Sequence, residues 1–265
     1  MNELSSHRAR KRFGQNFLVD QGVIERIIAA IHPRAEDNLV EIGPGQGALT
    51  GLLLAANRRL TAIELDRDLA ALLRAKFTDY PEFRLVEQDA LKVDFNSLAA
   101  GRPLRVVGNL PYNISTPLIF HLLSHANVIG DMHFMLQREV VERMAAEPGS
   151  KSYGRLSIAV QYLCRVDYLF GVPPGAFQPA PKVESAIVRL SPHVTKPVEA
   201  RDPARLFELI NLCFQQRRKT LRNNLKPWSS AADLDALGID LGRRPETLTV
   251  AEFVDLSNRL PPRHD

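Results

Sequence analysis

The sequence is poor in several features that mark particular classes of protein. Its two cysteines, Cys164 and Cys213, are far apart in apolar surroundings, so we expect buried thiols and no disulfide or cysteine zinc site. No apolar run reaches the ~20 residues of a membrane-spanning helix, and residues 1–15 lack the apolar core of a signal peptide. These absences predict a globular protein of the cytoplasm, and 265 residues suffice for a large and a small domain.

An excess of charge of one sign is also nearly absent, because 34 basic residues face 30 acidic ones. The basic residues are unevenly distributed, however. One cluster, at the N-terminus, consists of Arg8, Arg10, Lys11 and Arg12. The other, QQRRKTLRNNLK (215–226), is expected to form about three turns of helix. Such clusters can neutralise phosphates. On charge alone, a solvated helix face and a terminal tail are the preferred interpretation.

Segments with strand and helix patterns alternate along most of the chain. A first helix is expected from Asp20, its N-cap, to a stop at Pro33. Strands are expected at 38–43, 59–65, 83–88, 104–109, 132–137, 166–172 and 185–190. Helices are expected between them at 47–57, 66–77, 115–125 (capped by Ser115), 138–146 and 154–163.

This alternation predicts an α/β fold with a Rossmann-like parallel sheet and helices on both of its faces. Prolines and polar residues interrupt the pattern near 191–203, before a helical C-terminal segment. We therefore expect a main domain over residues 1–195 and a small helical domain over residues 196–265.

The first expected strand leads into a glycine-rich turn. Gly43, Gly45 and Gly47 form a GxGxG pattern in the segment EIGPGQG, at the start of an expected helix. Glycines at this point let a ligand lie against the backbone at the carboxyl edge of the sheet, where such folds bind nucleotides. A tight turn that binds nothing would have the same pattern, so the turn alone is weak evidence.

Acidic residues end the next two strands. Glu64 follows the turn by about twenty residues, at a place where a carboxylate can accept both hydroxyls of a ribose. Asp89 lies in the segment EQDAL, where it can accept from an adenine amino group while Ala90 and Leu91 flank the ring. Each acid alone could be a solvated strand end, but together with the turn they favour a ligand with a ribose and an adenine. Nicotinamide cofactors and S-adenosylmethionine both fit.

The end of the fourth strand distinguishes the two cofactors. It reads Asn109, Leu110, Pro111 and Tyr112, which a dehydrogenase does not need. The GxGxG spacing also departs from the dinucleotide pattern GxGxxG. An enzyme that methylates an exocyclic amine does need such a sequence, because the lone pair of that amine is delocalised into the ring. The sequence therefore favours S-adenosylmethionine.

Each of these four residues has an expected role in methylating adenine. Hydrogen bonds from the amine to the Asn109 side-chain oxygen and the Leu110 carbonyl would draw the nitrogen toward tetrahedral geometry. Tyr112 would stack on the base, and Pro111 would restrict the backbone so that both acceptors stay aimed. The methylated amine can lose its proton after the methyl transfer, so no buried general base is required.

Metal and hydrolase chemistry have little support. His121 and His125 share one helix face at the spacing of metal ligands, but the segment HLLSH lacks the glutamate of HExxH and no third ligand is evident. We expect structural or surface histidines and no metal. Ser115 and Ser157 lack a nucleophile elbow.

Several long segments together resemble the ribosomal RNA adenine dimethyltransferases, and within them the bacterial small-subunit group. The similar segments cover roughly residues 8–190, in the order of that family: FGQNFL, EIGPGQGALT, IELD, EQDAL, VVGNLPYNISTPLIFHLL, MLQREVVERMAA, YGRLS and VPPGAFQPAPKVESAIVRL. The resemblance implies a class I methyltransferase fold and two adjacent adenines of the 3′-terminal hairpin loop of 16S rRNA, dimethylated at N6 within an immature 30S particle. We also expect a monomer.

The resemblance further implies which residues contact the ligands. The cofactor contacts fall on Asn16, Leu18, Gly43, Glu64, Asp89 and Asn109. The pocket for the target base falls on Asn109, Leu110, Pro111, Tyr112 and Phe177. Phe177 would face the adenine opposite Tyr112. From the sequence alone, Phe177 could instead anchor its proline-rich loop by being buried. With RNA as substrate, the basic clusters and the C-terminal domain would contribute to rRNA binding.

Two other functions remain open. The large-subunit adenine methyltransferases that confer macrolide resistance share the glycine turn and the core of the Asn109 segment, although the segments NLPYNISTPLIFHLL and FQPAPKVESAIVRL are more similar to the small-subunit group. A protein that only binds, as relatives do in mitochondrial transcription or in checking ribosome assembly, could lose the cofactor and amine motifs. Both motifs are intact here.

Overall fold

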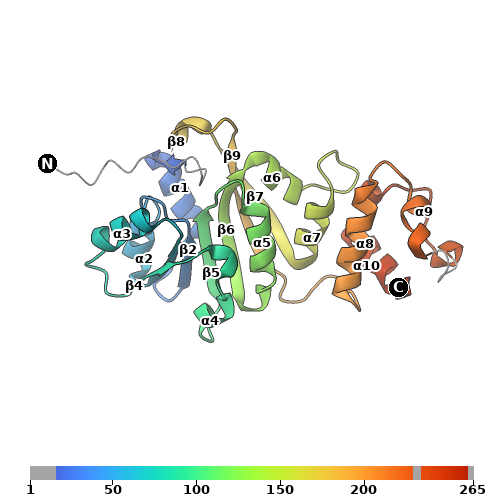
Figure 1. Ribbon diagram of the computed structural model, residues 1–265, viewed down its shortest axis with the longest axis horizontal. Coiled ribbons are helices and arrows are strands. Elements are labelled where there is room, and N and C mark those ends of the chain that lie inside the picture. Colours follow the sequence, from blue (N-terminus) through green and yellow to red (C-terminus); the bar gives the residue numbers. More distant parts are fainter. Residues whose placement is uncertain (1–15, 229–233, 262–265) are drawn as a thin grey trace. The chain divides into compact units, whose positions relative to one another are not determined.

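Seven strands form one mixed sheet in the computed structural model, which describes residues 16–228 and 234–261 (Figure 1). The strand order is β4-β3-β2-β5-β6-β9-β7, and helices lie on both faces. The strands are β2 (Asn38–Ile42), β3 (Leu60–Glu64), β4 (Phe83–Glu87), β5 (Leu104–Asn109), β6 (Ile129–Gln137), β7 (Cys164–Val172) and β9 (Ser185–Pro192). Each of the seven expected strands is confirmed, and so is the α/β fold.

The sheet is not entirely parallel, so that expectation was wrong. Strands β2 to β6 pair in parallel, with Val40 opposite both Thr61 and Val106. β9 runs antiparallel to β6. β9 is also a neighbour of β7, which precedes it in the chain. Residues 173–184 connect the two strands and contain no crossover helix. A strand that runs parallel to the strand before it requires such a crossover.

Local signals explain where the helices begin. In α1 (Gln21–Ile31) the Asp20 carboxylate caps the N-terminus by accepting from the backbone N–H of Val23, as expected. α2 (Thr50–Asn57) begins three residues later than expected, after Gly47, whose positive φ of 81° is not helical. The expected Ser115 cap of α5 (Ser115–Leu123) was wrong, because Ser115 is the first helical residue. Two further helices are α3 (Arg67–Lys76) and α4 (Phe95–Ala99).

The chain divides into two compact units. The first comprises Met1–Val141 and Asp167–Pro192, and the second comprises Glu142–Val166 and His193–Asp265. The expected boundary at residue 195 therefore differs from this division, because a segment from the middle of the chain belongs to the C-terminal unit. The physical reason is that α7 (Arg155–Leu163) packs against α8 (Pro203–Gln215) and α10 (Val250–Arg259).

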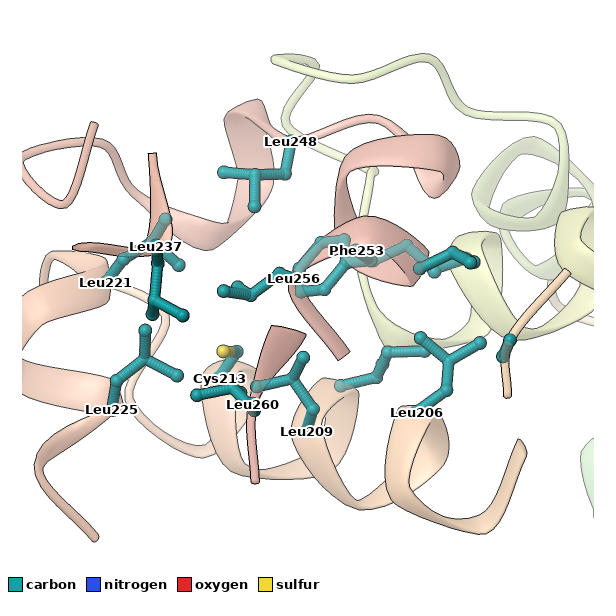
Figure 2. Packing of buried hydrophobic residues seen from close by; sticks show 14 of the residues in the cluster. Leu206, Leu209, Cys213, Leu221, Leu225, Leu237, Leu248, Phe253, Leu256 and Leu260 are labelled. Carbon is teal, nitrogen blue, oxygen red and sulfur yellow. The ribbon is translucent and has the colours of Figure 1, made fainter. Parts of the chain in front are cut away.

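The second unit is helical and has its own hydrophobic core. Leu206, Leu209 and Cys213 of α8 belong to one buried cluster with Phe253 and Leu256 of α10 (Figure 2). The short helix α9 (Leu221–Asn224) adds Leu221 to the same cluster. Both cysteines are free and buried, as the sequence predicted.

The expected continuous helix over residues 215–226 was wrong. α8 ends at Gln215, and a new helix starts only after Thr220. Between them the guanidinium of Arg217 donates to the backbone carbonyls of Ser150 and Lys151. The break lets the chain turn, and Leu221 and Leu225 become buried. The N-terminal cations Arg8, Arg10, Lys11 and Arg12 lie outside the described residues.

Across residues 16–228 and 234–261, no helix has the length and apolar character that crossing a membrane would require.

Candidate active site

A cavity of about 290 Å³ lies at the carboxyl ends of β2, β3 and β5. Parallel strands that start together end at the same edge of the sheet, so segments far apart in the sequence meet there. The cavity is lined by residues 16–18, 41–46, 48–49, 63–66, 69, 88–91 and 109–114. It thus brings together every residue expected to contact cofactor or base, with the exception of Phe177.

The glycine-rich turn forms one wall of the cavity. Gly43 and Gly45 have φ angles of 65° and 58°, in the left-handed region that favours glycine. A Cβ on Gly45 would lie 3.3 Å from Cδ1 of Phe17, and one on Gly43 would lie 3.4 Å from the Asn109 carbonyl oxygen. Side chains at both positions would therefore be strained by their φ angles, and one on Gly45 would also crowd the ring of Phe17. The turn fits the close approach of a ligand to its backbone.

Glu64 lies at the end of β3, with 8% of its surface exposed. Its two carboxylate oxygens accept backbone N–H groups, Oε1 from Asp66 at 2.9 Å and Oε2 from Gly45 at 3.4 Å. Burial raises its pKa, and these hydrogen bonds oppose the rise. The contacts tie the carboxylate to the glycine turn, at the place where the sequence predicted a ribose.

Asp89 follows β4, whose end lies beside the end of β3. The backbone N–H of Gln88 donates to the Glu64 carbonyl oxygen at 3.2 Å, which brings the two strand ends together. Oδ1 of Asp89 accepts the N–H of Leu91 at 3.0 Å and so caps the short helix that begins at Ala90. Ala90 and Leu91 line the cavity beside it, and their contact with an adenine stays a prediction.

Asn109 is the last residue of β5 and is anchored through its amide nitrogen. Nδ2 donates to the backbone carbonyl of Asn16 at 3.3 Å. The donor end of the amide thus points to the N-terminal segment, so the side-chain oxygen is the acceptor that can serve a ligand. The backbone N–H of the next residue, Leu110, donates to Met135 on β6 at 3.2 Å.

Residues 111–114 turn back after the strand. The carbonyl of Pro111 accepts the N–H of Ile114 at 3.2 Å, and the carbonyl of Tyr112 accepts the Ser115 hydroxyl at 3.1 Å. The phenol oxygen of Tyr112 makes a 2.6 Å hydrogen bond with the hydroxyl of Ser185. Burial raises the pKa of Tyr112, and this hydrogen bond opposes the rise. No pattern in the sequence pointed to Ser185.

Phe177 is placed differently from the other expected site residues. It forms the two-residue strand β8 (Phe177–Gln178), which pairs with β1 (Phe17–Leu18), and 4% of its surface is exposed. Its ring packs in a hydrophobic cluster that includes Leu18, Ile24 and Val172, and Phe177 does not line the cavity. This position matches the alternative in which the ring anchors its loop. A contact with the target base stays a prediction.

Glu41 lines the cavity and was not predicted. Its side chain is buried in β2, and Oε2 accepts the hydroxyl of Thr50 at 2.7 Å. Burial raises its pKa to about 7, and the nearby Glu64 carboxylate adds to the rise. A charged residue within the apolar segment NLVEIG, directly before the glycine turn, was the signal that could have revealed it.

The two histidines of α5 make contacts within the fold. Nε2 of His121 lies 2.9 Å from the carbonyl oxygen of Val93, and Nδ1 of His125 lies 2.9 Å from the carbonyl oxygen of His121. In the part of the chain that the structure describes, no group of three or more His, Cys, Asp or Glu side chains could hold a metal ion.

Comparison with known proteins identifies the family. The model of the family described as "Ribosomal RNA adenine dimethylase" matches residues 6–261. Two relatives named "Ribosomal RNA small subunit methyltransferase A" are similar over 98% of this chain and 97% of their own length: the protein of Pseudomonas aeruginosa is 62% identical over 261 residues, and that of Saccharophagus degradans is 60% identical over 260.

Two solved structures with similar folds are consistent with this family. A dimethyladenosine transferase from Plasmodium falciparum superposes with a TM-score of 0.76 at 28% identity, covering 91% of this chain and 95% of its own. The 23S rRNA methyltransferase ErmE superposes with a TM-score of 0.70 at 28% identity, covering 92% of this chain and 99% of its own. With a matching family model across nearly its whole length, the chain belongs to the ribosomal RNA adenine dimethylase family.

Proposed function

We propose that this protein uses S-adenosylmethionine to dimethylate N6 of two adjacent adenines in the 3′-terminal hairpin loop of 16S rRNA, during assembly of the small ribosomal subunit in the cytoplasm. One observation carries the proposal: the acceptor of Asn109 shares a cavity with the strand-end carboxylates Glu64 and Asp89. The small-subunit target rests on relatives at about 60% identity that are named for that subunit.

The lining of the cavity fits the cofactor. Glu64 would accept from the ribose hydroxyls, and Asp89 would accept from the adenine amino group. Asn16, Leu18 and Gly43 line the same space and would contact the rest of the molecule. When bound, S-adenosylmethionine supplies a methyl group on a positively charged sulfonium. Buried carboxyls at Glu41 and Glu64 suit a cationic ligand, because a nearby positive charge favours their ionised form.

Asn109 would activate the target amine. Its amide nitrogen is occupied by the Asn16 carbonyl, so its oxygen is presented as an acceptor without needing to reorient. With the Leu110 carbonyl as the second acceptor, the amine nitrogen is drawn toward tetrahedral geometry and its lone pair becomes available. After the first transfer the amine keeps one N–H, so the second methylation should depend more strongly on the remaining hydrogen bond.

The target adenine must leave its stack in the rRNA hairpin to reach this site. Tyr112 would stack on the extracted base, and its half-buried ring lines the cavity next to Asn109. The C-terminal unit would add affinity through exposed cations such as Arg218 and Lys219, which neutralise phosphates without reading bases. In this proposal the partner is an immature 30S particle, and the protein acts as a monomer.

The proposal is tested by single-turnover methylation of 30S particles that lack the modification, with mono- and dimethyladenosine scored separately by mass analysis. Asn109→Ala should slow the transfer by about 10²-fold or more, the scale for losing one preorganised polar group. Affinity for the particle should barely change, because phosphate contacts dominate it. Asn96→Ala, at an exposed position of the same unit, is the matched control and should react like the wild type.

Each outcome has a clear meaning. Near-normal dimethylation by Asn109→Ala would overturn the amine-activation mechanism. In a parallel assay on isolated 23S rRNA, methyl transfer to this RNA and not to 16S rRNA would assign the protein to the large-subunit enzymes, to which ErmE belongs by its name. No transfer to either RNA by the wild type, with binding retained, would indicate a protein that only binds.

A further inference from the structure

We propose that Ser185 is a positioning residue for the methylation reaction, and that its hydroxyl holds the ring of Tyr112 in the orientation in which a target base can stack on it. The inference deepens the proposed function and rests on it. Ser185 lies in a different strand from the Asn109 segment, 73 residues further along the chain than Tyr112, and nothing in the comparisons gives it a role.

The contact itself is close and protected from water. The two oxygen atoms are 2.6 Å apart, within the normal range for a hydroxyl-to-hydroxyl hydrogen bond. Ser185 has 0% of its surface exposed, so water cannot compete for its side chain. A buried hydrogen bond of this kind also avoids leaving a polar group without a partner. The phenol therefore has one well-defined anchor.

The position of Ser185 is set by backbone contacts on both sides. It is the first residue of β9 and lies opposite Gln137, the last residue of β6. Directly before it, the carbonyl of Glu184 accepts the backbone N–H of Arg138 at 2.9 Å, and the side chains of these two residues form an ion pair at 2.6 Å. β6 also pairs with β5, the strand that ends in Asn109. The serine hydroxyl and the Asn109 amide are thus built on neighbouring parts of one sheet.

Tyr112 is consequently held at both ends. Ser115 binds its backbone carbonyl at 3.1 Å and Ser185 binds its phenol oxygen at 2.6 Å. Without the second hydrogen bond the ring could turn about its side-chain bonds, and ordering it on base capture would cost conformational entropy. With that hydrogen bond, the aromatic face is already oriented when the base arrives. The expected consequence is a faster methyl transfer at unchanged affinity for cofactor and for the particle.

A double-mutant cycle between Tyr112 and Ser185 tests this role. Tyr112→Phe keeps the ring and removes the anchored oxygen, whereas Ser185→Ala removes the anchor. Each should slow single-turnover methylation at saturating substrate by roughly 3- to 10-fold, the equivalent of removing one hydrogen bond. Because both changes remove the same interaction, the double variant should be slowed no more than either single one. Cofactor affinity, measured by calorimetry, should not change.

Ser157→Ala is the matched control. Ser157 is also fully buried, and its hydroxyl donates to the carbonyl of Arg143 within the second unit. Its loss should lower stability without changing the methylation rate. Additive losses in the double variant, or a wild-type rate for Ser185→Ala, would overturn the positioning role. If Ser185→Ala does not fold, Tyr112→Phe decides alone, and a wild-type rate for it refutes the proposal. Failure of the proposed function is distinguishable, because the wild type would then not methylate 16S rRNA.

Discussion

Two carboxyl side chains with raised pKa values line the cavity, although carboxylates are seldom buried. Glu41 and Glu64 both lose hydration in the folded protein, and their proximity raises the pKa of Glu41 further. Glu64 is compensated by two backbone N–H groups and Glu41 by one hydroxyl. This difference in hydrogen bonding explains why Glu41 should carry the clearer pH dependence of stability.

Glu41→Gln should change how stability depends on pH. The pKa of Glu41 rises from 4.5 to about 7 on folding, so the folded state binds its proton more tightly than the unfolded state. The stabilisation from that proton is full below pH 4.5 and is lost as the pH rises to about 7. When the pH is raised from 5 to 8, the free energy of unfolding of the wild type should therefore fall by on the order of 1–3 kcal/mol more than that of Glu41→Gln.

Urea unfolding followed by circular dichroism at both pH values measures this difference. Glu36→Gln, at an exposed position of the same unit, serves as the control and should follow the wild type. Equal pH dependence in the wild type and Glu41→Gln would show that the buried carboxyl does not hold its proton.

At the scale of elements, the short strands β1 and β8 connect the N-terminal segment to the site. Two residues per strand are too few to be stable alone, so the pairing of Leu18 with Phe177 depends on burying both side chains in one cluster. The N–H of Val19 also donates to the carbonyl of Ala176 at 2.9 Å. This arrangement keeps Asn16 in place, where its carbonyl orients the amide of Asn109.

Phe177→Ala should therefore reduce the stability of the fold, and its effect on the site should follow from that loss. Removing a ring that is 4% exposed should cost about 3–5 kcal/mol, and the loosened β1 should weaken binding of S-adenosylmethionine. Phe177→Leu retains a large apolar side chain and should recover most of the stability and cofactor affinity. Thermal unfolding and calorimetric titration measure the two effects. If Phe177→Leu is stable and binds cofactor but methylates slowly, the ring also faces the base, as the family resemblance implies.

At the scale of the whole molecule, the cations of residues 215–226 differ in their availability to RNA. Arg217 donates to two backbone carbonyls and lies 3.9 Å from Glu246, and Arg222 pairs with Asp235. The side chains of Arg218 and Lys219, in contrast, are exposed. Because only cations that reach phosphates release counterions, the latter two should account for more of the salt dependence of binding.

We expect Arg218→Ala and Lys219→Ala each to flatten the slope of log K against log salt concentration by about 0.7–0.9 for each phosphate that the variant no longer neutralises. Arg222→Ala, which removes a cation already paired with Asp235, should change the slope less and is the matched control. Equilibrium binding to 30S particles at several salt concentrations gives these slopes. Unchanged slopes in both variants would show that these cations do not contact RNA and belong to a solvated surface.

The sequence alone was sufficient for the parts of this protein that depend on local patterns. Asp20 caps α1 because the side chain of an N-cap residue needs only the next few backbone N–H groups. The period of apolar residues identified the strands. Parallel strands end at a common edge of a sheet, so the strand assignment also predicted that Gly43, Glu64 and Asn109 would meet. All three residues line the cavity.

Only the tertiary structure decided the neighbours that do not follow from the shared edge of the parallel strands. Ser185 reaches Tyr112 because β9 enters the sheet beside β6, against its direction. Phe177 is buried because β8 pairs with the N-terminal strand, and residues 142–166 join the C-terminal unit because α7 packs on α8 and α10. The hydrophobic pattern of a segment says which of its faces is buried, but not which segment buries it. That choice depends on long-range packing, which no local pattern contains.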